Sequence, residues 1–171
     1  HAVVGSAGID ESNANGYWIL WPRSPFRSAK EIWNYLRKKH GLKRLGIVIT
    51  DSVSPPMRLG CVGISIGFFG IHPTERHIGK RDIFGRKFKF SRSNLVDGIA
   101  AAAALTMGET DERNPIAIVR EVPAIRYASY DTARELLIRP KDDIYYPILK
   151  PIYGAEKKQE SKVRIVRSRL S

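Results

Sequence analysis

Residues 45–52 read LGIVITDS, and residues 61–70 read CVGISIGFFG. The first is a short, continuous apolar run, which is typical of a strand buried on both faces. It ends in Asp51 and Ser52, so a carboxylate and a hydroxyl follow a rigid element. The second has the composition of a strand, and its spaced glycines predict bulges or the close approach of another backbone. The two segments therefore predict the sheet around which the rest of the chain is arranged.

Two helices are predicted outside this sheet. Ser28 and Glu31 match a capping box, and apolar residues such as Trp33 follow at helical spacing until a basic last turn and Gly41. The second helix runs from Asn94, a good N-cap, through an alanine-rich stretch to Gly108. Its residues are nearly all small and apolar, which predicts a tightly packed, buried helix.

Several shorter elements complete the prediction. Strands are expected at 2–4, 17–21, 87–90 and 115–119, with a late edge strand at 163–166, a short helix at 131–138 and an extended segment at 140–152. These strands do not alternate regularly with crossover helices, which favours an α+β fold over a doubly wound sheet. We expect one domain over residues 1–155 and a basic C-terminal tail over residues 156–171.

Composition limits the kind of protein. The 171 residues carry a net charge of +12, which invites a polyanionic partner but equally fits a solvated basic surface. There is no zinc-finger, RRM or KH signature, and no apolar run approaches the roughly 20 residues that span a bilayer. Cys61 is the only cysteine, so no internal disulfide can form and a cytoplasmic location is expected. The chain begins at His1 within a strand-like stretch, and we expect a natural N-terminal part to precede it.

Strand ends offer candidate metal ligands. Asp10 follows the first apolar stretch, and Asp51 and Ser52 follow the buried strand. These hard oxygen donors suit magnesium or manganese, although each aspartate could simply start a turn or cap an amide. His72 and His77 lack a third ligand at zinc spacing and are expected at the surface.

A charged cluster is the second candidate site. Its members surround a glycine turn and are Lys80, Arg81, Asp82 and Arg86. They form either a solvated loop or a clamp for phosphate or carboxylate groups. No dinucleotide fingerprint, P-loop or nucleophile elbow occurs, so a nucleotide would have to bind by another route.

Six motifs occur together in one order: SAGIDESN, VITDS, GCVGISIGFFG, IGKRDIFGRKF, the alanine-rich helix ending in LTMGE, and NPIAIV. In this order they resemble the coenzyme F-420 γ-glutamyl ligase family, which adds glutamate to a deazaflavin coenzyme. The resemblance covers residues 1–119 and is closest to bacterial members assigned to folate metabolism.

The resemblance implies an α+β homodimer that uses GTP, with magnesium or manganese and a monovalent cation as further candidates. It implies metal ligands at Asp10, Asp51 and Ser52. It places the nucleotide at Asn13 and along residues 107–114, namely Met107, Gly108, Glu109, Thr110, Asp111, Glu112, Arg113 and Asn114. The implied substrates are L-glutamate and an F-420 precursor or a folate-like acceptor.

From charge alone, we expect Lys80, Arg81 and Arg86, with Asp82, to hold substrate carboxylates. Two alternatives stay open: a non-enzymatic nucleic-acid-binding protein, supported only by charge, and a family member that binds nucleotide without ligating. We expect neither a membrane nor a nucleic acid as the partner.

Overall fold

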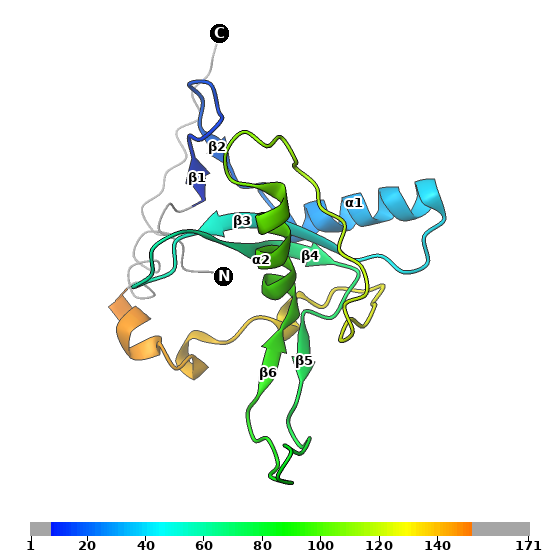
Figure 1. The fold of residues 1–171 in the computed structure, drawn as a ribbon, viewed down its shortest axis with the longest axis vertical. Coiled ribbons are helices and arrows are strands. Elements are labelled where there is room, and N and C mark those ends of the chain that lie inside the picture. The colour runs from blue at the N-terminus through cyan, green and yellow to red at the C-terminus, as the bar shows by residue number, and fades with distance from the viewer. Residues whose placement is uncertain (1–7, 152–171) are drawn as a thin grey trace, which may run out of the picture. The chain divides into compact units, whose positions relative to one another are not determined.

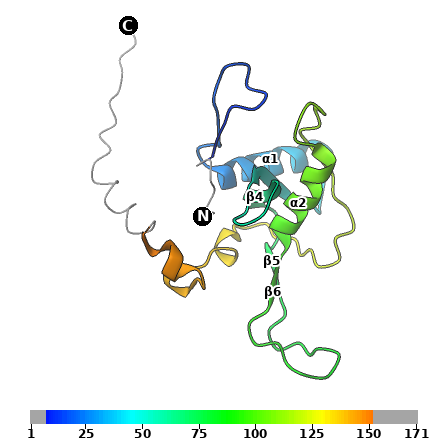
Figure 2. The ribbon, with the colours of Figure 1, turned by 60° about the vertical axis from the view of Figure 1, so that its left-hand side comes forward.

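The computed structural model describes residues 8–151, arranged as two compact units that divide between Leu136 and Leu137. The first unit holds the six strands, the two α-helices and one 3-10 helix (Figures 1 and 2). This mixture of small antiparallel sheets and a few helices confirms the α+β prediction. The strands expected at 2–4 and 163–166, and the basic tail, lie outside the described residues.

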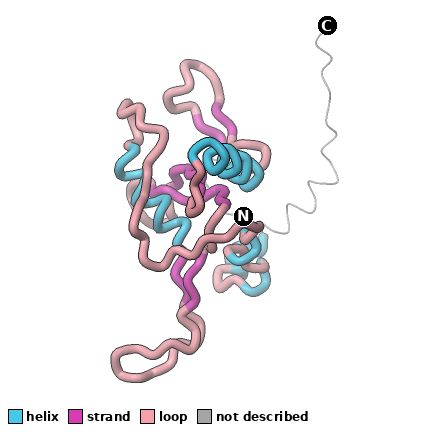
Figure 3. Tube along the Cα trace, turned by 90° about the vertical axis from the view of Figure 1, so that its right-hand side faces the viewer, coloured by secondary structure: helices cyan, strands magenta, loops and turns pink. Residues whose placement is uncertain are grey.

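A two-stranded antiparallel hairpin forms the centre of the first unit. Strand β3 (Ile47–Val53) pairs with β4 (Val62–Phe69), and helices α1 (Pro25–His40) and α2 (Leu95–Met107) cover its opposite faces (Figures 1 and 3). On one face Ala29, Trp33 and Phe69 form a buried cluster; on the other, Phe68, Ile71 and Val96 do so. Both faces of β3 are therefore covered, as expected, although its residues are only half buried.

The glycines of β4 allow the two helices to approach. A bulge interrupts the register between Ile49 and Thr50, so Gly63 faces α2 whereas Gly67 faces the start of α1. A Cβ on Gly63 would lie 2.6 Å from the Ala100 carbonyl oxygen, and one on Gly67 would lie 2.5 Å from the Pro25 carbonyl carbon. The prediction of bulges and close backbone approach is confirmed.

Helix α1 begins earlier than the capping-box pattern indicated. Ser24 is its N-cap and Pro25 its first residue, while the Glu31 side chain pairs with Arg27. The predicted capping box is therefore wrong, because proline at the first helical position starts the helix without a side-chain cap. The basic last turn and the left-handed Gly41 end the helix as predicted.

Helix α2 begins as predicted but is buried on one side only. The Asn94 side chain accepts a hydrogen bond from the Asp97 N–H, and Asp97 in turn accepts one from the Ser65 N–H of β4. Val96, Ala100 and Ala103 are buried, whereas Leu105 is 90 % exposed. The expectation of a wholly buried helix is wrong for this outer side, since no element of the described part of the chain covers it.

A projecting hairpin joins the sheet to α2. Strand β5 (Thr74–Arg76) pairs with β6 (Arg92–Asn94), and the connection between them extends beyond both strands (Figure 1). We call residues 76–92 the arm. The strand expected at 87–90 is wrong: Lys87 forms an isolated bridge to Arg81 and the Phe88 backbone bonds to Lys80 and Gly79, so the pairing stops after two residues.

Segments after α2 differ from their sequence patterns. Residues 115–119 do not form the expected strand, and Ile116 and Ile118 are 82 % and 77 % exposed because no described segment pairs with them. The helix expected at 131–138 is the single 3-10 turn η1 (Ala133–Glu135). In the second unit, η2 (Pro140–Asp142) and a helical turn at 146–151 replace the expected extended segment.

Over residues 8–151, neither α-helix has the length and apolar composition needed to cross a membrane.

Candidate functional site

The first part of the site is a short hairpin near the start of the described chain. Strand β1 (Ile9–Asp10) pairs with β2 (Ile19–Leu20), so Asp10 lies within a strand and not in the turn. The Asp10 carboxylate accepts a hydrogen bond of 2.9 Å from the Ser12 N–H. This backbone donor holds the pKa of Asp10 below its ordinary value of 3.8. The Asp10 carboxylate is thus held in place by a backbone donor and is ionised at neutral pH.

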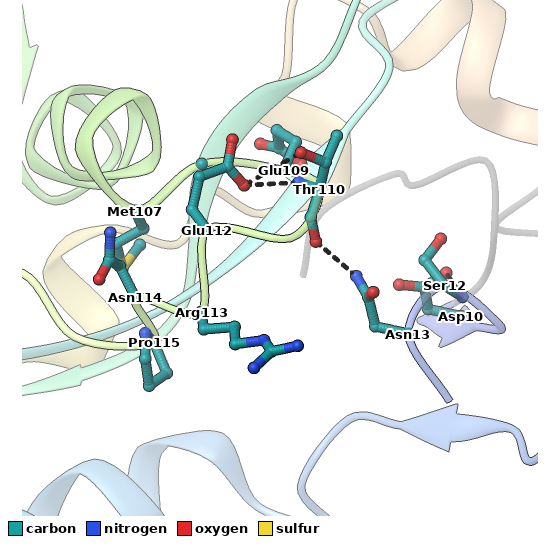
Figure 4. Close-up of a pocket in the computed structure, with 11 residues that line it drawn as sticks. Asp10, Ser12, Asn13, Met107, Glu109, Thr110, Glu112, Arg113, Asn114 and Pro115 are labelled. Atoms are coloured by element: carbon teal, nitrogen blue, oxygen red, sulfur yellow. Dashed lines mark hydrogen bonds between the residues drawn. The ribbon is translucent and has the colours of Figure 1, made fainter. Parts of the chain in front are cut away.

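The turn of this hairpin reaches a segment almost 100 positions away. Asn13 and Asn15 adopt left-handed backbone angles, which asparagine tolerates better than most residues. The Asn13 side chain donates a hydrogen bond of 2.9 Å to the Thr110 carbonyl oxygen (Figure 4). The turn is therefore attached directly to the segment that follows α2.

The segment that follows α2 is an acidic loop, residues 109–114. Glu112 folds back so that its carboxylate accepts hydrogen bonds from the Thr110 N–H and hydroxyl at 2.8 and 3.2 Å. The backbone N–H of Thr110 is the main reason that the pKa of Glu112 lies below its ordinary value of 4.5. Gly108 permits this fold, because a Cβ there would lie 2.1 Å from the Glu112 carboxyl carbon.

These two segments line one open pocket of about 470 Å³. The lining includes Asp10, Asn13 and most of the predicted nucleotide segment, with the Arg113 side chain extending toward the space between loop and hairpin (Figure 4). Asp111 is the one member of residues 107–114 that does not line it. A pocket of this size falls within the usual range for small-molecule ligands.

Asp51 and Ser52 lie in β3 and connect to this region through hydrogen bonds. The Ser52 hydroxyl donates to the Glu109 carboxylate at 2.6 Å, and the Trp21 indole N–H donates to the Asp51 carboxylate at 2.7 Å. Glu109 lines the pocket, and Trp21 directly follows β2. The central strand is thus linked to both walls of the pocket.

The donor chemistry fits a magnesium or manganese ion bound together with phosphate groups. Asp10, Asp51, Ser52 and Glu109 offer carboxylate and hydroxyl oxygens, which these hard cations prefer. Within residues 8–151, no three His, Cys, Asp or Glu side chains gather into a ready-made metal cage. Magnesium usually needs only one or two carboxylates when a substrate phosphate completes its shell. The metal assignment of Asp10, Asp51 and Ser52 stays a prediction.

The charged cluster lies elsewhere in the first unit. Lys80, Arg81, Asp82 and Arg86 are on the arm, which leaves α2 at its N-terminal end, whereas the acidic loop follows its C-terminal end (Figures 1 and 2). Lys80 pairs with Glu75, and Arg81 donates to the Gly85 carbonyl oxygen. The structure does not bring the cluster to the pocket of its own chain, and its role as a carboxylate clamp stays a prediction.

Three residues of this region were missed by reasoning from the sequence. Ser12 and Pro115 line the pocket, and Trp21 holds Asp51. Ser12 and Pro115 could have been found from their position beside predicted site residues. No local pattern indicated Trp21, because its contact depends on how β2 lies beside β3.

Comparison with known proteins identifies the family of this chain. The family model described as F420-0:Gamma-glutamyl ligase matches residues 2–121. The chain belongs to this family.

Among its relatives is the coenzyme F420:L-glutamate ligase of Methanopyrus kandleri, 40 % identical over 146 residues, a region covering 84 % of this chain and 58 % of that protein. The proteins of the same name from Methanocaldococcus jannaschii and Methanothermobacter thermautotrophicus are each 38 % identical, over 82 % of this chain and 55 % of theirs. The chain therefore spans a little over half the length of the curated relatives it matches.

Proposed function

We propose that the chain is part of a ligase that forms an amide bond between L-glutamate and an acceptor carboxylate, using GTP and a divalent metal ion. The observation that carries this proposal is the convergence of Asp10 and Asn13 with the acidic loop around one pocket, in a member of this family. The names of the relatives support glutamate as substrate and an F-420 precursor as acceptor. A folate-like acceptor is the alternative within the same chemistry.

The reaction takes place in two steps. An acceptor carboxylate oxygen attacks the γ-phosphorus of GTP, which releases GDP and forms an acyl phosphate. The glutamate amine then attacks the acyl carbon, the C–O bond to phosphate breaks, and the amine loses a proton as the amide forms. A bound magnesium or manganese ion would offset the negative charge of the phosphate groups during the transfer.

The residues of the chain supply positions and charges for these steps. Asp10, Asp51 and Ser52 would hold the metal, and Asn13 and residues 107–114 would hold the nucleotide. The arm residues Lys80, Arg81 and Arg86 would hold substrate carboxylates. We further propose a cytoplasmic, homodimeric enzyme, with a monovalent cation as an additional cofactor.

Calorimetry with GTP and Mn²⁺ tests the proposal. GTP should bind in the presence of Mn²⁺ and lose its affinity when the metal is chelated. If the affinity for GTP does not change when the metal is chelated but falls steeply as salt is added, the result would instead support the nucleic-acid-binding alternative. Binding without glutamate incorporation into any acceptor would support the non-ligating alternative.

A further inference from the structure

Trp21 connects the strands that carry the two predicted metal carboxylates. Its indole N–H donates a hydrogen bond of 2.7 Å to one carboxylate oxygen of Asp51. Its backbone N–H donates to the Gly8 carbonyl oxygen at 3.2 Å, which extends the β1–β2 pairing by one step. Asp10 lies two positions after Gly8, and side chains two positions apart in a strand point to the same face. Asp10 and the Trp21 indole therefore share one face of the hairpin.

Two hydrogen bonds join this hairpin to the rest of the first unit within the described residues. At its turn, the Asn13 side chain donates to the Thr110 carbonyl oxygen, and at its open end the Trp21 indole donates to Asp51 (Figure 4 shows the first). In the same part of the chain, neither β1 nor β2 pairs with the central sheet. Apart from the chain that leads into α1, these two side chains therefore determine where Asp10 lies relative to β3.

The backbone of Gly8 holds the indole ring in place. A Cβ on Gly8 would lie 2.7 Å from the nearest ring carbon of Trp21, which is closer than real Cβ contacts come. The half-buried ring thus packs directly on the peptide backbone, at a place where a larger residue would leave it no room. Packing of this kind restricts the rotamers of the indole, so its N–H is held toward Asp51.

An indole N–H is suited to orienting a metal ligand because it carries no charge. A lysine or arginine in its place would add a positive charge, which repels a divalent cation. The indole has a single donor, so it occupies one oxygen of Asp51 and leaves the other available to an ion. Groups that hydrogen-bond to metal ligands orient them in this way, and losing one typically lowers metal affinity about 10- to 100-fold.

We propose that Trp21 is a positioning residue for the divalent metal ion, because it orients Asp51 on the face of the hairpin that Asp10 shares. This role rests on the proposed metal-dependent function. Without the indole N–H, the Asp51 carboxylate is free to rotate and the open end of the hairpin is detached from β3. The two carboxylates then no longer converge on one ion. Trp21 acts through Asp51 and does not itself bind the metal.

Manganese binding without nucleotide tests this role. Electron paramagnetic resonance of the free ion gives the Mn²⁺ dissociation constant of the whole chain. Trp21→Phe keeps an aromatic ring but has no donor, and it should raise this constant about tenfold. Trp18→Phe is the matched control and should leave it unchanged, because Trp18 is 65 % exposed and lies three positions away, on the opposite face of the strand. Equal constants for the two variants would overturn the proposal.

Gly8→Ala tests the same contact without removing the donor, and it serves if Trp21→Phe does not fold. Its new Cβ would displace the indole ring, so the Mn²⁺ dissociation constant should again rise, by up to about tenfold. Gly16→Ala is the matched control, since Gly16 has a φ of +85° against +77° for Gly8 but open space around it. An equal rise in both alanine variants would assign the effect to backbone strain and overturn the role of the indole.

Indole N–H resonances give a readout that a purely structural role would not change. The chain has three tryptophans, so a ¹⁵N-labelled sample shows three such signals, which the two phenylalanine variants assign. Mn²⁺ is paramagnetic and broadens the signals of nuclei close to it. The Trp21 signal should broaden first, while that of Trp33, which donates to the Leu45 carbonyl oxygen in the core, should stay sharp. A sharp Trp21 signal at saturating Mn²⁺ would place the ion away from Asp51 and overturn the proposal.

The same titrations separate this inference from the proposed function. If the parent chain and Trp21→Phe bind Mn²⁺ equally well, Trp21 has no positioning role while the proposed metal site stands. If the parent chain binds no Mn²⁺, either alone or together with GTP, the proposed metal-dependent function fails and the role of Trp21 fails with it.

Discussion

Replacing Asn13 by alanine should weaken GTP binding because it releases the acidic loop from the β1–β2 turn. The lost contact is the 2.9 Å hydrogen bond from the Asn13 side chain to the Thr110 carbonyl oxygen, which joins the two walls of the pocket. A hydrogen bond between neutral groups contributes about 0.5–1.5 kcal/mol, which corresponds to about a two- to twelvefold loss of affinity. The structure places this bond between exposed groups, so we expect a value in the lower half of that range.

Asn15→Ala is the matched control for this change. Asn15 lies in the same turn and also has a left-handed backbone, with φ of 48° against 56° for Asn13. Both substitutions therefore carry a similar backbone penalty of about 1 kcal/mol, whereas only the first removes the bond to Thr110. Calorimetry with GTP and Mn²⁺ should show the weaker binding for Asn13→Ala. Equal losses in the two variants would refute a role for the Asn13 side chain in joining the walls.

Further expectations follow from the same contacts. Asp51→Asn should abolish the Mn²⁺ dependence of GTP binding, because it removes an anionic oxygen from the predicted metal site. The thermal midpoint should stay within a few degrees, because the amide oxygen still accepts the hydrogen bond from Trp21. Unchanged Mn²⁺ dependence would show that Asp51 does not belong to the site. Folding lowers the pKa of Asp10 from its ordinary value of 3.8 and that of Glu112 from 4.5. The hydrogen bond of Asp10 to Ser12 and that of Glu112 to Thr110 are therefore at full strength above these ordinary values. They are lost as the pH falls through the pKa values of the folded protein. Amide exchange at Ser12 and Thr110, compared with a buried β4 amide as reference, should show constant protection at neutral pH and loss only below the ordinary values of 3.8 for Asp10 and 4.5 for Glu112. Loss of protection at a pH above these ordinary values would contradict this reasoning. Gly67→Ala should lower the free energy of unfolding in urea by about 1–3 kcal/mol, because the new Cβ meets the Pro25 backbone. Gly85→Ala is the control: open space surrounds Gly85, so the substitution should cost only about 1 kcal/mol, for the positive φ of this residue. Similar costs at both glycines would show that α1 can move away from β4.

Local signals predicted the elements whose ends are determined by neighbours in sequence. Asn94 and Asp97 cap α2 as the pattern indicated, and Gly41 ends α1, because these interactions lie within one turn of helix. The capping-box pattern failed at Ser28 because Pro25 had already started the helix. The central strands β3 and β4 also formed where their apolar runs predicted them, because each offers the other a hydrogen-bonding edge.

Segments that need a partner could not be predicted in this way. The pattern at 115–119 is that of a strand, but a strand forms only where another offers its hydrogen-bonding edge, and none of the described chain does so. The arm shows the same dependence. Of its alternating residues 87–90, Lys87 and Phe88 find backbone partners on the opposite side of the arm, and the paired strand β6 starts later, at Arg92.

For the candidate site, the sequence by itself determined which residue types are present and in which order, and that order was enough to indicate the family. Only the tertiary structure decided that Asn13 reaches Thr110, that Ser52 reaches Glu109 and that Trp21 holds Asp51. It also decided that the basic arm and the acidic loop lie at opposite ends of α2. The physical reason is that composition and spacing describe neighbours along the chain, whereas a site is made by segments that packing of the helices on the sheet brings together.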